Sequence, residues 1–247
     1  MEEVLKVQTL KGGYQRNKPV LHEVDFSVSS SEIVGLIGLN GAGKSTTIKH
    51  ILGFMEPFSG NVTIQGRTFL NDPETYRSSY TFIPETPMLY EELTLKEHLE
   101  LTAMAYGVAE DDYKKRSKKL LKEYRMEKMA NWFPSHFSKG MRQKVMIMCA
   151  FMVSPPLYVV DEPFVGLDPI GIKSFLDHIV SLKERGAAVL MSTHILATAE
   201  RYCDRFILLH DGEVVVSGTL ADLQAQTGLQ GASLDDIYVH VTKEDVR

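Results

Sequence analysis

The alternation of apolar and polar residues divides the first part of the chain into strands. Residues 4–10 and 20–28 alternate, which predicts antiparallel strands that each have one solvated face. Residues 33–37 are mostly apolar and predict a buried strand, and the periodicity of residues 45–52 is helical. A further strand is predicted at 61–65, after a turn rich in Pro, Ser and Gly.

The middle of the chain changes to helical periodicity. After a short buried strand at 80–83, residues from 95 to about 133 predict a helical insertion, and another helix is predicted over 138–153. The run of lysines at 114–119 fits either a nucleic-acid patch or the solvated face of an amphipathic helix. An apolar stripe that continues through Leu120 favours the solvated face.

Nearly continuous apolar strands alternate with helices in the second half of the chain. Such alternation is typical of a parallel sheet that is covered by helices on both faces. The predicted strands are 157–161, 187–192, 205–209 and 213–216, and the predicted helices are 170–184 and 196–202. We interpret the residues after the last strand as a polar tail.

The composition excludes several classes of protein. A length of 247 residues suits one large α/β domain or a core with a sizeable insertion. The 27 lysines and arginines against 32 acidic residues give a net charge of −5, so we expect no nucleic acid partner. The longest apolar stretch, 145–153, is far shorter than the ~20 residues of a membrane helix, and the first residues carry no secretory signal pattern. The two cysteines suggest reduced, buried thiols, so we expect a cytoplasmic protein; if it works at a membrane, another chain must supply the membrane spans.

A glycine-rich segment between a predicted strand and a predicted helix indicates nucleotide binding. Residues 38–45 fit the P-loop pattern Gly-x4-Gly-Lys-Ser. Glycines let consecutive backbone N–H groups curl around an anion, and the helix N-terminus adds partial positive charge. We expect Lys44 to reach the β- and γ-phosphates and the Ser45 hydroxyl to bind Mg²⁺. The predicted nucleotide contacts are Gly38, Leu39, Asn40, Gly41, Ala42, Gly43, Lys44, Ser45 and Thr46.

Two adjacent carboxylates narrow the choice among the classes of P-loop protein. P-loops occur in kinases, GTPases, helicases and transport ATPases, but the guanine-specifying pattern Asn-Lys-x-Asp is not matched at 17–20, which reads Asn-Lys-Pro-Val. The strand at 157–161 delivers Asp161 and Glu162 at its C-terminal end, which is the edge of a parallel sheet where ligands bind. We expect Asp161 to hold Mg²⁺ and Glu162 to polarise an attacking water.

Three more motifs follow in a fixed order. Residues 138–143 read Ser-Lys-Gly-Met-Arg-Gln, residues 166–168 read Gly-Leu-Asp, and residues 192–194 read Ser-Thr-His. With Tyr14, the P-loop and the two acids, they make the chain resemble the ATP-binding subunit of ABC transporters over nearly all of its length. The ending at 233–238 is similar to that of export-type subunits, those of the bacterial Ecs exporter group among them.

The resemblance implies a fold and a division of the chain. The implied fold is α/β: a P-loop NTPase of the ABC ATPase type with a mostly parallel core sheet, an antiparallel β subdomain and an inserted α-helical subdomain. The ATP-binding core with the antiparallel subdomain is expected at 1–88 and 155–225. The helical subdomain that bears the 138–143 signature is expected at 89–154, and a C-terminal tail at 226–247.

The resemblance also implies roles for single residues. Tyr14 stacks on adenine, Glu162 and His194 act in hydrolysis, and Ser138 and Gly140 cover a nucleotide held by the other subunit, as does Asp168. Taken singly, Tyr14 and His194 would suit core packing, but the order and spacing of the motifs favour the site. The resemblance further implies that ATP with Mg²⁺ pairs two copies head to tail, and that the pair drives an integral membrane transporter subunit. A soluble non-transport ABC ATPase and a regulatory ATP-binding module with weak hydrolysis stay open as alternatives.

Two residues depart from the usual family pattern. Glu85 occupies a position that is commonly glutamine, where it is expected either to bind Mg²⁺ or to turn to solvent. Lys139 replaces a glycine of the signature, and it either adds to the positive helix end or points to solvent.

Overall fold

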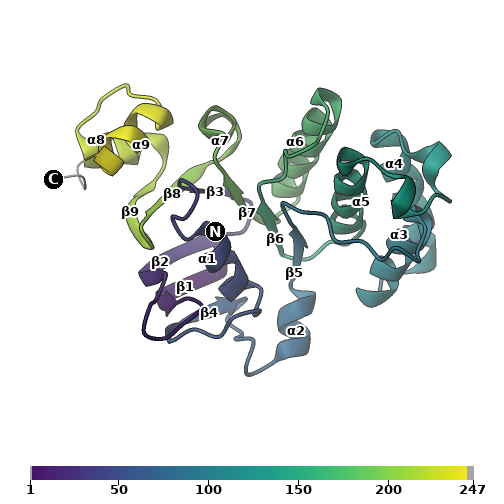
Figure 1. Ribbon diagram of the computed structural model, residues 1–247, viewed down its shortest axis with the longest axis horizontal. Coiled ribbons are helices and arrows are strands. Elements are labelled where there is room, and N and C mark those ends of the chain that lie inside the picture. The colour runs from purple at the N-terminus through teal and green to yellow at the C-terminus, as the bar shows by residue number, and fades with distance from the viewer. Residues whose placement is uncertain (1, 244–247) are drawn as a thin grey trace.

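The computed structural model describes residues 2–243, in which an antiparallel sheet packs on a larger core sheet (Figure 1). The smaller sheet has the order β2-β1-β4, made of β1 (Glu3–Gly12), β2 (Leu21–Ser29) and β4 (Ser59–Ile64). Val7 and Val24 of this sheet belong to the same buried cluster as Val34 and Leu36 of the core sheet. The predicted antiparallel subdomain is therefore confirmed.

The core sheet has the strand order β5-β6-β7-β3-β8-β9. All neighbouring pairs are parallel except β8 with β9, so the sheet is mostly parallel as predicted. Its strands are β5 (Tyr80–Ile83), β6 (Leu157–Asp161), β7 (Ala188–Thr193), β3 (Ile33–Ile37), β8 (Arg205–His210) and β9 (Glu213–Gly218). Because β6, β7 and β3 are adjacent and parallel, the segments that follow them meet at one edge of the sheet.

Helices cover the core sheet and form a separate group beside it (Figure 1). The helices α1 (Lys44–Ile51), α6 (Pro169–Glu184) and α7 (Leu196–Tyr202) follow the core strands β3, β6 and β7. The predicted helical insertion consists of α3 (Leu95–Ala105), α4 (Glu110–Glu123) and α5 (Lys139–Met152), with short 3₁₀ turns at Glu127–Met129 and Pro134–His136. Leu99, Val145 and Phe175 share one buried cluster, which fastens the insertion to α6.

The lysines of the insertion lie on the outer face of α4. Leu120 is buried whereas Lys114, Lys115, Lys118 and Lys119 are exposed, and Lys114 pairs with Glu110 at 2.6 Å. The amphipathic interpretation of this run is therefore confirmed.

Three helices occur where none was expected. The short helix α2 (Pro73–Ser78) is capped by Asp72, and α8 (Leu220–Thr227) and α9 (Leu234–Lys243) follow β9. The interpretation of this region as a polar tail is wrong for its described residues, and residues 244–247 lie outside them. Leu223, Leu234, Ile237 and Tyr238 are buried with Phe206 and Leu208 of β8. The helices α8 and α9 each contain only a few apolar residues. Their helical periodicity is therefore hard to recognise in the sequence without knowing that they pack against β8.

None of the helices in the described part of the chain is long and apolar enough to cross a membrane. Cys149 and Cys203 are free thiols. Burial raises the pKa of the Cys149 thiol to about 11 and that of the Cys203 thiol to about 12. Both are therefore protonated and unreactive at neutral pH.

The contribution of α9 to stability is testable. Ile237→Ala should lower the free energy of unfolding by about 2–4 kcal/mol, because it leaves a cavity among fully buried side chains. Val239→Ala, on the exposed side of the same helix, should change it by less than about 0.5 kcal/mol. Urea unfolding of both variants checks this, and equal small effects would show that the C-terminal helices add little to the fold.

Candidate nucleotide-binding site

The P-loop connects β3 to α1, and its glycines are required by its shape. Gly41 and Gly43 have positive φ angles of 93° and 109°, where side chains with a Cβ are strained. A Cβ at Gly38 would lie 2.6 Å from the carbonyl oxygen of Leu209. Leu39, Asn40, Gly41 and Ser45 are exposed, whereas Ala42 and Thr46 are buried. The exposed backbone between β3 and the first turn of α1 thus forms a cradle for an anion.

The Lys44 side chain lies across this loop and is buried. Its Nζ donates to the carbonyl oxygens of Gly38 at 2.7 Å and of Leu39 at 3.3 Å. An ammonium has three N–H donors, so one remains for another acceptor. Glu162 Oε1 is 3.8 Å from the same nitrogen, which is an ion-pair distance but longer than a hydrogen bond.

Asp161 and Glu162 lie at the end of β6, beside the end of β7. Ser192 donates its hydroxyl to Asp161, which fixes that carboxylate. Glu162 has a positive φ of 45°, and its Oε2 lies 2.8 Å from Nδ1 of His194 and accepts the backbone N–H of His194 at 3.3 Å. The structure therefore brings Lys44, Asp161, Glu162 and His194 together as predicted.

One oxygen of the Glu162 carboxylate has no hydrogen-bond partner among the described residues. This atom, Oε1, is buried and has only Lys44 in ion-pair range. A buried carboxylate oxygen without a donor is unfavourable unless a water or a ligand supplies one. The unpaired Oε1 of Glu162 therefore has capacity for a further hydrogen-bond donor, and the role of Glu162 as a base stays a prediction.

Tyr14 lies beside α1, where it contacts Lys49. Its side chain is exposed, and its hydroxyl accepts a hydrogen bond from Lys49 at 3.0 Å. The Lys49 ammonium also lies 5.2 Å from the centre of the Tyr14 ring. This contact with Lys49 lowers the pKa of the Tyr14 hydroxyl. An exposed ring next to the P-loop helix is available for stacking, and its role on adenine stays a prediction.

Ser138 and Gly140 stand at the start of α5, away from α1 (Figure 1). Ser138 is the N-cap, and its hydroxyl accepts the N–H of Met141 at 3.3 Å. A Cβ at Gly140 would lie 2.1 Å from the carbonyl oxygen of Gly166, so only glycine fits there. No hydrogen bond or ion pair between described residues joins this helix start to the P-loop.

Asp168 caps α6 and belongs to the α5 side of the molecule. Its carboxylate pairs with Lys144 of α5 at 2.7 Å and accepts the N–H of Gly171 at 2.6 Å. The Lys144 ammonium is the main cause that lowers the pKa of Asp168. Ser138, Gly140 and Asp168 therefore form a second group that the chain does not bring onto its own P-loop. Lys144 was not anticipated, although it lies one helical turn beyond Gly140.

Glu85 and Lys139 are both exposed. Glu85 lies two residues beyond the end of β5, and within residues 2–243 it makes no hydrogen bond or ion pair. Its neighbour Pro84 is fastened to α5, since Gln143 donates its side-chain amide to the Pro84 carbonyl at 3.0 Å. The metal role of Glu85 is not decided by these contacts and stays a prediction.

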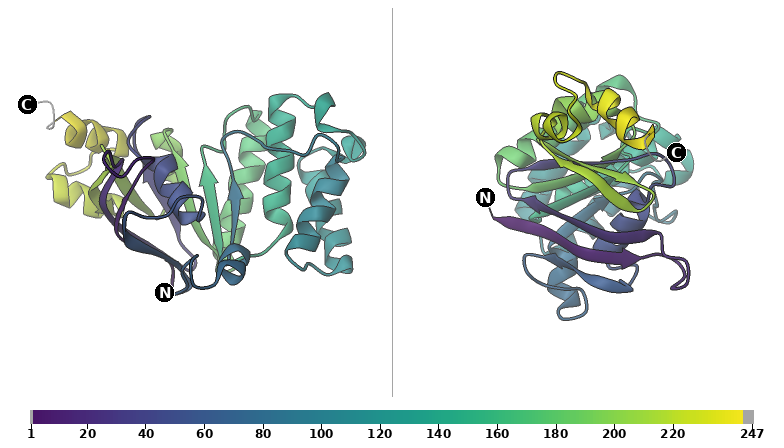
Figure 2. Two further views of the ribbon diagram at one scale, coloured as in Figure 1. Left: turned by 60° about the horizontal axis from the view of Figure 1, so that its bottom comes forward. Right: turned by 90° about the vertical axis from the view of Figure 1, so that its left-hand side faces the viewer.

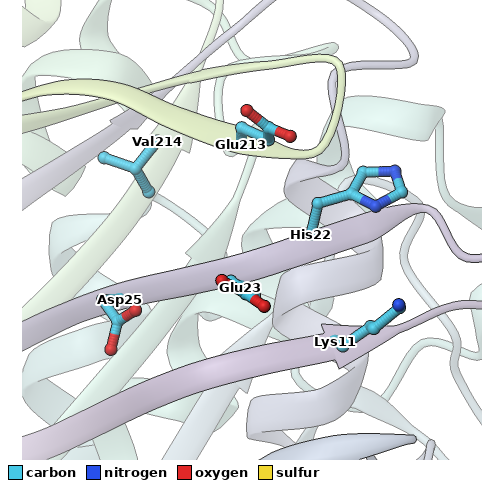
Figure 3. A pocket seen from close by; sticks show the side chains of 6 residues that line it. All are labelled: Lys11, His22, Glu23, Asp25, Glu213 and Val214. Atoms are coloured by element: carbon cyan, nitrogen blue, oxygen red, sulfur yellow. The ribbon is translucent and has the colours of Figure 1, made fainter.

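A hollow elsewhere on the surface carries no comparable chemistry. Figure 3 shows side chains from β1, β2 and β9 that line it and point apart: Lys11, His22, Glu23, Asp25, Glu213 and Val214. Within the described residues, no group of three or more His, Cys, Asp or Glu side chains is arranged to hold a metal ion. The candidate site is therefore the edge of the core sheet at the P-loop.

The comparison with known families agrees with this geometry. Residues 21–165, which include the P-loop and both acids, match the model of the ABC transporter family. The chain belongs to the ABC transporter family, as an ATP-binding subunit with ATPase activity. The fold class and the class of function expected from the sequence are thereby confirmed.

Two relatives match over almost their entire length. The chain is 62% identical to the ABC-type transporter ATP-binding protein EcsA of Bacillus subtilis (strain 168), over 98% of each chain. It is 44% identical to the uncharacterized ABC transporter ATP-binding protein YthP of the same organism, over 99% of each. The likeness to the Ecs exporter group is therefore confirmed.

Solved structures agree with the sequence matches. The structure of an ATP-binding subunit of an ABC transporter superposes with a TM-score of 0.94 at 57% identity, over 97% of this chain and 99% of that one. A dimeric post-hydrolysis ATP-binding cassette bound to ADP and Pi superposes with a TM-score of 0.79 at 27% identity, over 87% and 98%.

The exposed, unpaired carboxylate of Glu85 permits a direct test of its metal role. Glu85→Gln should shift the Mg²⁺ dependence of ATP hydrolysis to higher concentration, because a hard cation loses a charged ligand. The maximal rate should stay within about tenfold, since Asp161 and Glu162 are untouched. A Mg²⁺ titration of ATPase activity measures both quantities. Glu74→Gln on α2 removes the same charge at another exposed site and should match wild type. Identical titrations for all three proteins would show that Glu85 faces solvent.

Proposed function

We propose that this chain energises export through a separate integral membrane subunit, by ATP-dependent head-to-tail pairing of two copies. The observation that carries the proposal is the Glu162 carboxylate. His194 holds one of its oxygens, and the other is buried within 3.8 Å of Lys44 without a hydrogen-bond donor. This is the arrangement that a general base for water attack on a phosphate requires.

Hydrolysis then uses the residues at the sheet edge. The P-loop N–H groups and Lys44 bind the phosphates of ATP and stabilise the charge that develops on them. Glu162 accepts a proton from water as the water attacks the γ-phosphorus, and the bond to ADP breaks. His194 keeps the Glu162 carboxylate in place. Oxygen atoms of Ser45 and Asp161 suit a hard cation, so we expect them to hold Mg²⁺, which neutralises phosphate charge.

A second copy completes the site. The first turn of α5 offers backbone N–H groups and the positive end of the helix. Ser138 and Lys139 at this end are exposed, so a ligand can reach it. Because this end lies away from the P-loop of its own chain, the phosphate that it caps belongs to another copy. ATP then links the two copies, and its hydrolysis removes the link.

The membrane partner is expected to dock on the segment that follows Glu85 and on α3. Large apolar side chains are exposed there, with Met88 at 81%, Tyr90 at 63% and Met104 at 72%. Large apolar side chains that are exposed along one segment are candidate contacts for a protein partner. The adjoining Gln143 bond to Pro84 connects this face to α5. A partner seated here is therefore linked mechanically to the start of the signature helix, and the chain is expected to work at the inner face of the membrane.

The role of Glu162 is tested by Glu162→Gln. This variant should keep its affinity for ATP but hydrolyse ATP at least ~100-fold more slowly, because the amide cannot accept the proton. It should also accumulate an ATP-bound dimer on gel filtration. Turnover near that of wild type would rule out Glu162 as the base.

The docking face is tested by charge reversal at Glu92. Glu91 pairs with Arg142 of α5, so its reversal would also disturb the signature helix. Glu92 is exposed and has no partner among the described residues, which makes Glu92→Lys the cleaner change. It should lower the amount of membrane subunit that co-purifies by about threefold, since charges at an interface rim tune association.

The matched control for that experiment is Lys118→Glu on the exposed face of α4. It reverses one charge on the same insertion and should leave co-purification unchanged. A larger loss for Lys118→Glu than for Glu92→Lys would place the partner on α4 instead.

A further inference from the structure

The peptide group between Gly38 and Leu39 is held from both sides. The N–H of Leu39 donates to the hydroxyl oxygen of Tyr238 at 2.8 Å, across 199 positions of the sequence. The carbonyl of Gly38, in the same peptide group, accepts from Lys44 Nζ at 2.7 Å. A peptide group is planar, and its N–H and C=O point in opposite directions. An acceptor that fixes the N–H therefore also fixes the direction of the carbonyl that holds Lys44.

Tyr238 has little freedom of its own. Its ring is 6% exposed and packs with Ile37, which directly precedes the P-loop, and with Leu208 of β8. The first residue of its helix, Leu234, donates its N–H to the Glu200 carboxylate of α7 at 2.7 Å. Burial raises the pKa of the Tyr238 hydroxyl, so the phenol is neutral at physiological pH and its oxygen accepts the N–H. The hydroxyl is thus presented to the P-loop by a firmly anchored helix.

The orientation of this peptide matters for the Lys44 ammonium. Two of its three donors lie on the carbonyls of Gly38 and Leu39, which aims the third donor. If the peptide of Gly38 and Leu39 rotated, one of these two anchors would be lost. Lys44 would then have to be ordered when the nucleotide binds, and that ordering would lower the affinity.

We propose that Tyr238 is a positioning residue for ATP binding, which acts through the peptide of Gly38 and Leu39 on the ammonium of Lys44. The C-terminal helix thereby sets the nucleotide affinity of the P-loop, although it lies outside the residues 21–165 that match the family model. The inference rests on ATP binding at the P-loop.

The test is Tyr238→Phe, which removes the hydroxyl and keeps the ring in its apolar cluster. The Kd for a non-hydrolysable ATP analogue, measured by calorimetry with Mg²⁺, should rise about three- to tenfold, the usual effect of one lost hydrogen bond. The ATPase rate at saturating ATP should stay within about twofold of wild type, because the groups that act on water are unchanged. Amide hydrogen exchange at Leu39, followed by NMR, should become faster.

Tyr158→Phe is the matched control, since Tyr158 is buried and its hydroxyl donates to the Val153 carbonyl at 2.9 Å. Tyr158→Phe should lower the Tm about as much as Tyr238→Phe does, but it should leave both the Kd and the Leu39 exchange rate unchanged. An unchanged Kd in Tyr238→Phe, or an equal rise in Tyr158→Phe, would overturn the assignment. Failure of the wild-type chain to bind the analogue would instead contradict the proposed function.

Discussion

The ammonium of Lys44 and the carboxylate of Glu162 are two buried, oppositely charged groups that the surrounding structure must hold in place. Removing such charges from water is costly, and at 3.8 Å they do not satisfy each other with a hydrogen bond. Lys44 is supported by two backbone carbonyls, and Glu162 by His194. The Lys44 ammonium can still donate one hydrogen bond, and the Glu162 carboxylate can still accept one. The site is therefore arranged for a ligand with phosphate oxygens and for a water.

The rest of the fold holds these two charges in place. β3, β6 and β7 are adjacent parallel strands, and the segments that follow them carry Lys44, Glu162 and His194 to one edge. Two large apolar clusters lie on either side of this sheet, one toward the antiparallel sheet and one toward the helical insertion. The second cluster also places the start of α5 at a distance from the P-loop. The same packing thus builds the P-loop side of the site and holds the helical insertion apart from the antiparallel sheet, as the left view of Figure 2 shows.

Local sequence patterns predicted those parts of the fold whose conformation depends on residues close together in the chain. The apolar strand at 33–37, the glycines of the P-loop and the two acids at the end of β6 each have a short-range signature, and each lies where it was expected. Contacts between distant segments had no such signature. Tyr238 meets Leu39 across 199 positions, and Lys144 meets Asp168 across 24. The helices α8 and α9 were missed for the same reason, because their few apolar residues are buried only against β8.

We propose that the start of α5 in one copy completes the P-loop site of another. Sedimentation of Glu162→Gln and of the double variant Glu162→Gln/Ser138→Arg, with and without ATP, tests this claim most directly. Arginine at the exposed N-cap of α5 obstructs that helix end but leaves the P-loop of its own chain intact. We expect an ATP-dependent dimer for Glu162→Gln, and a monomer that still binds ATP for the double variant. A double variant that dimerises with ATP as well as Glu162→Gln, or one that no longer binds ATP as a monomer, would contradict it.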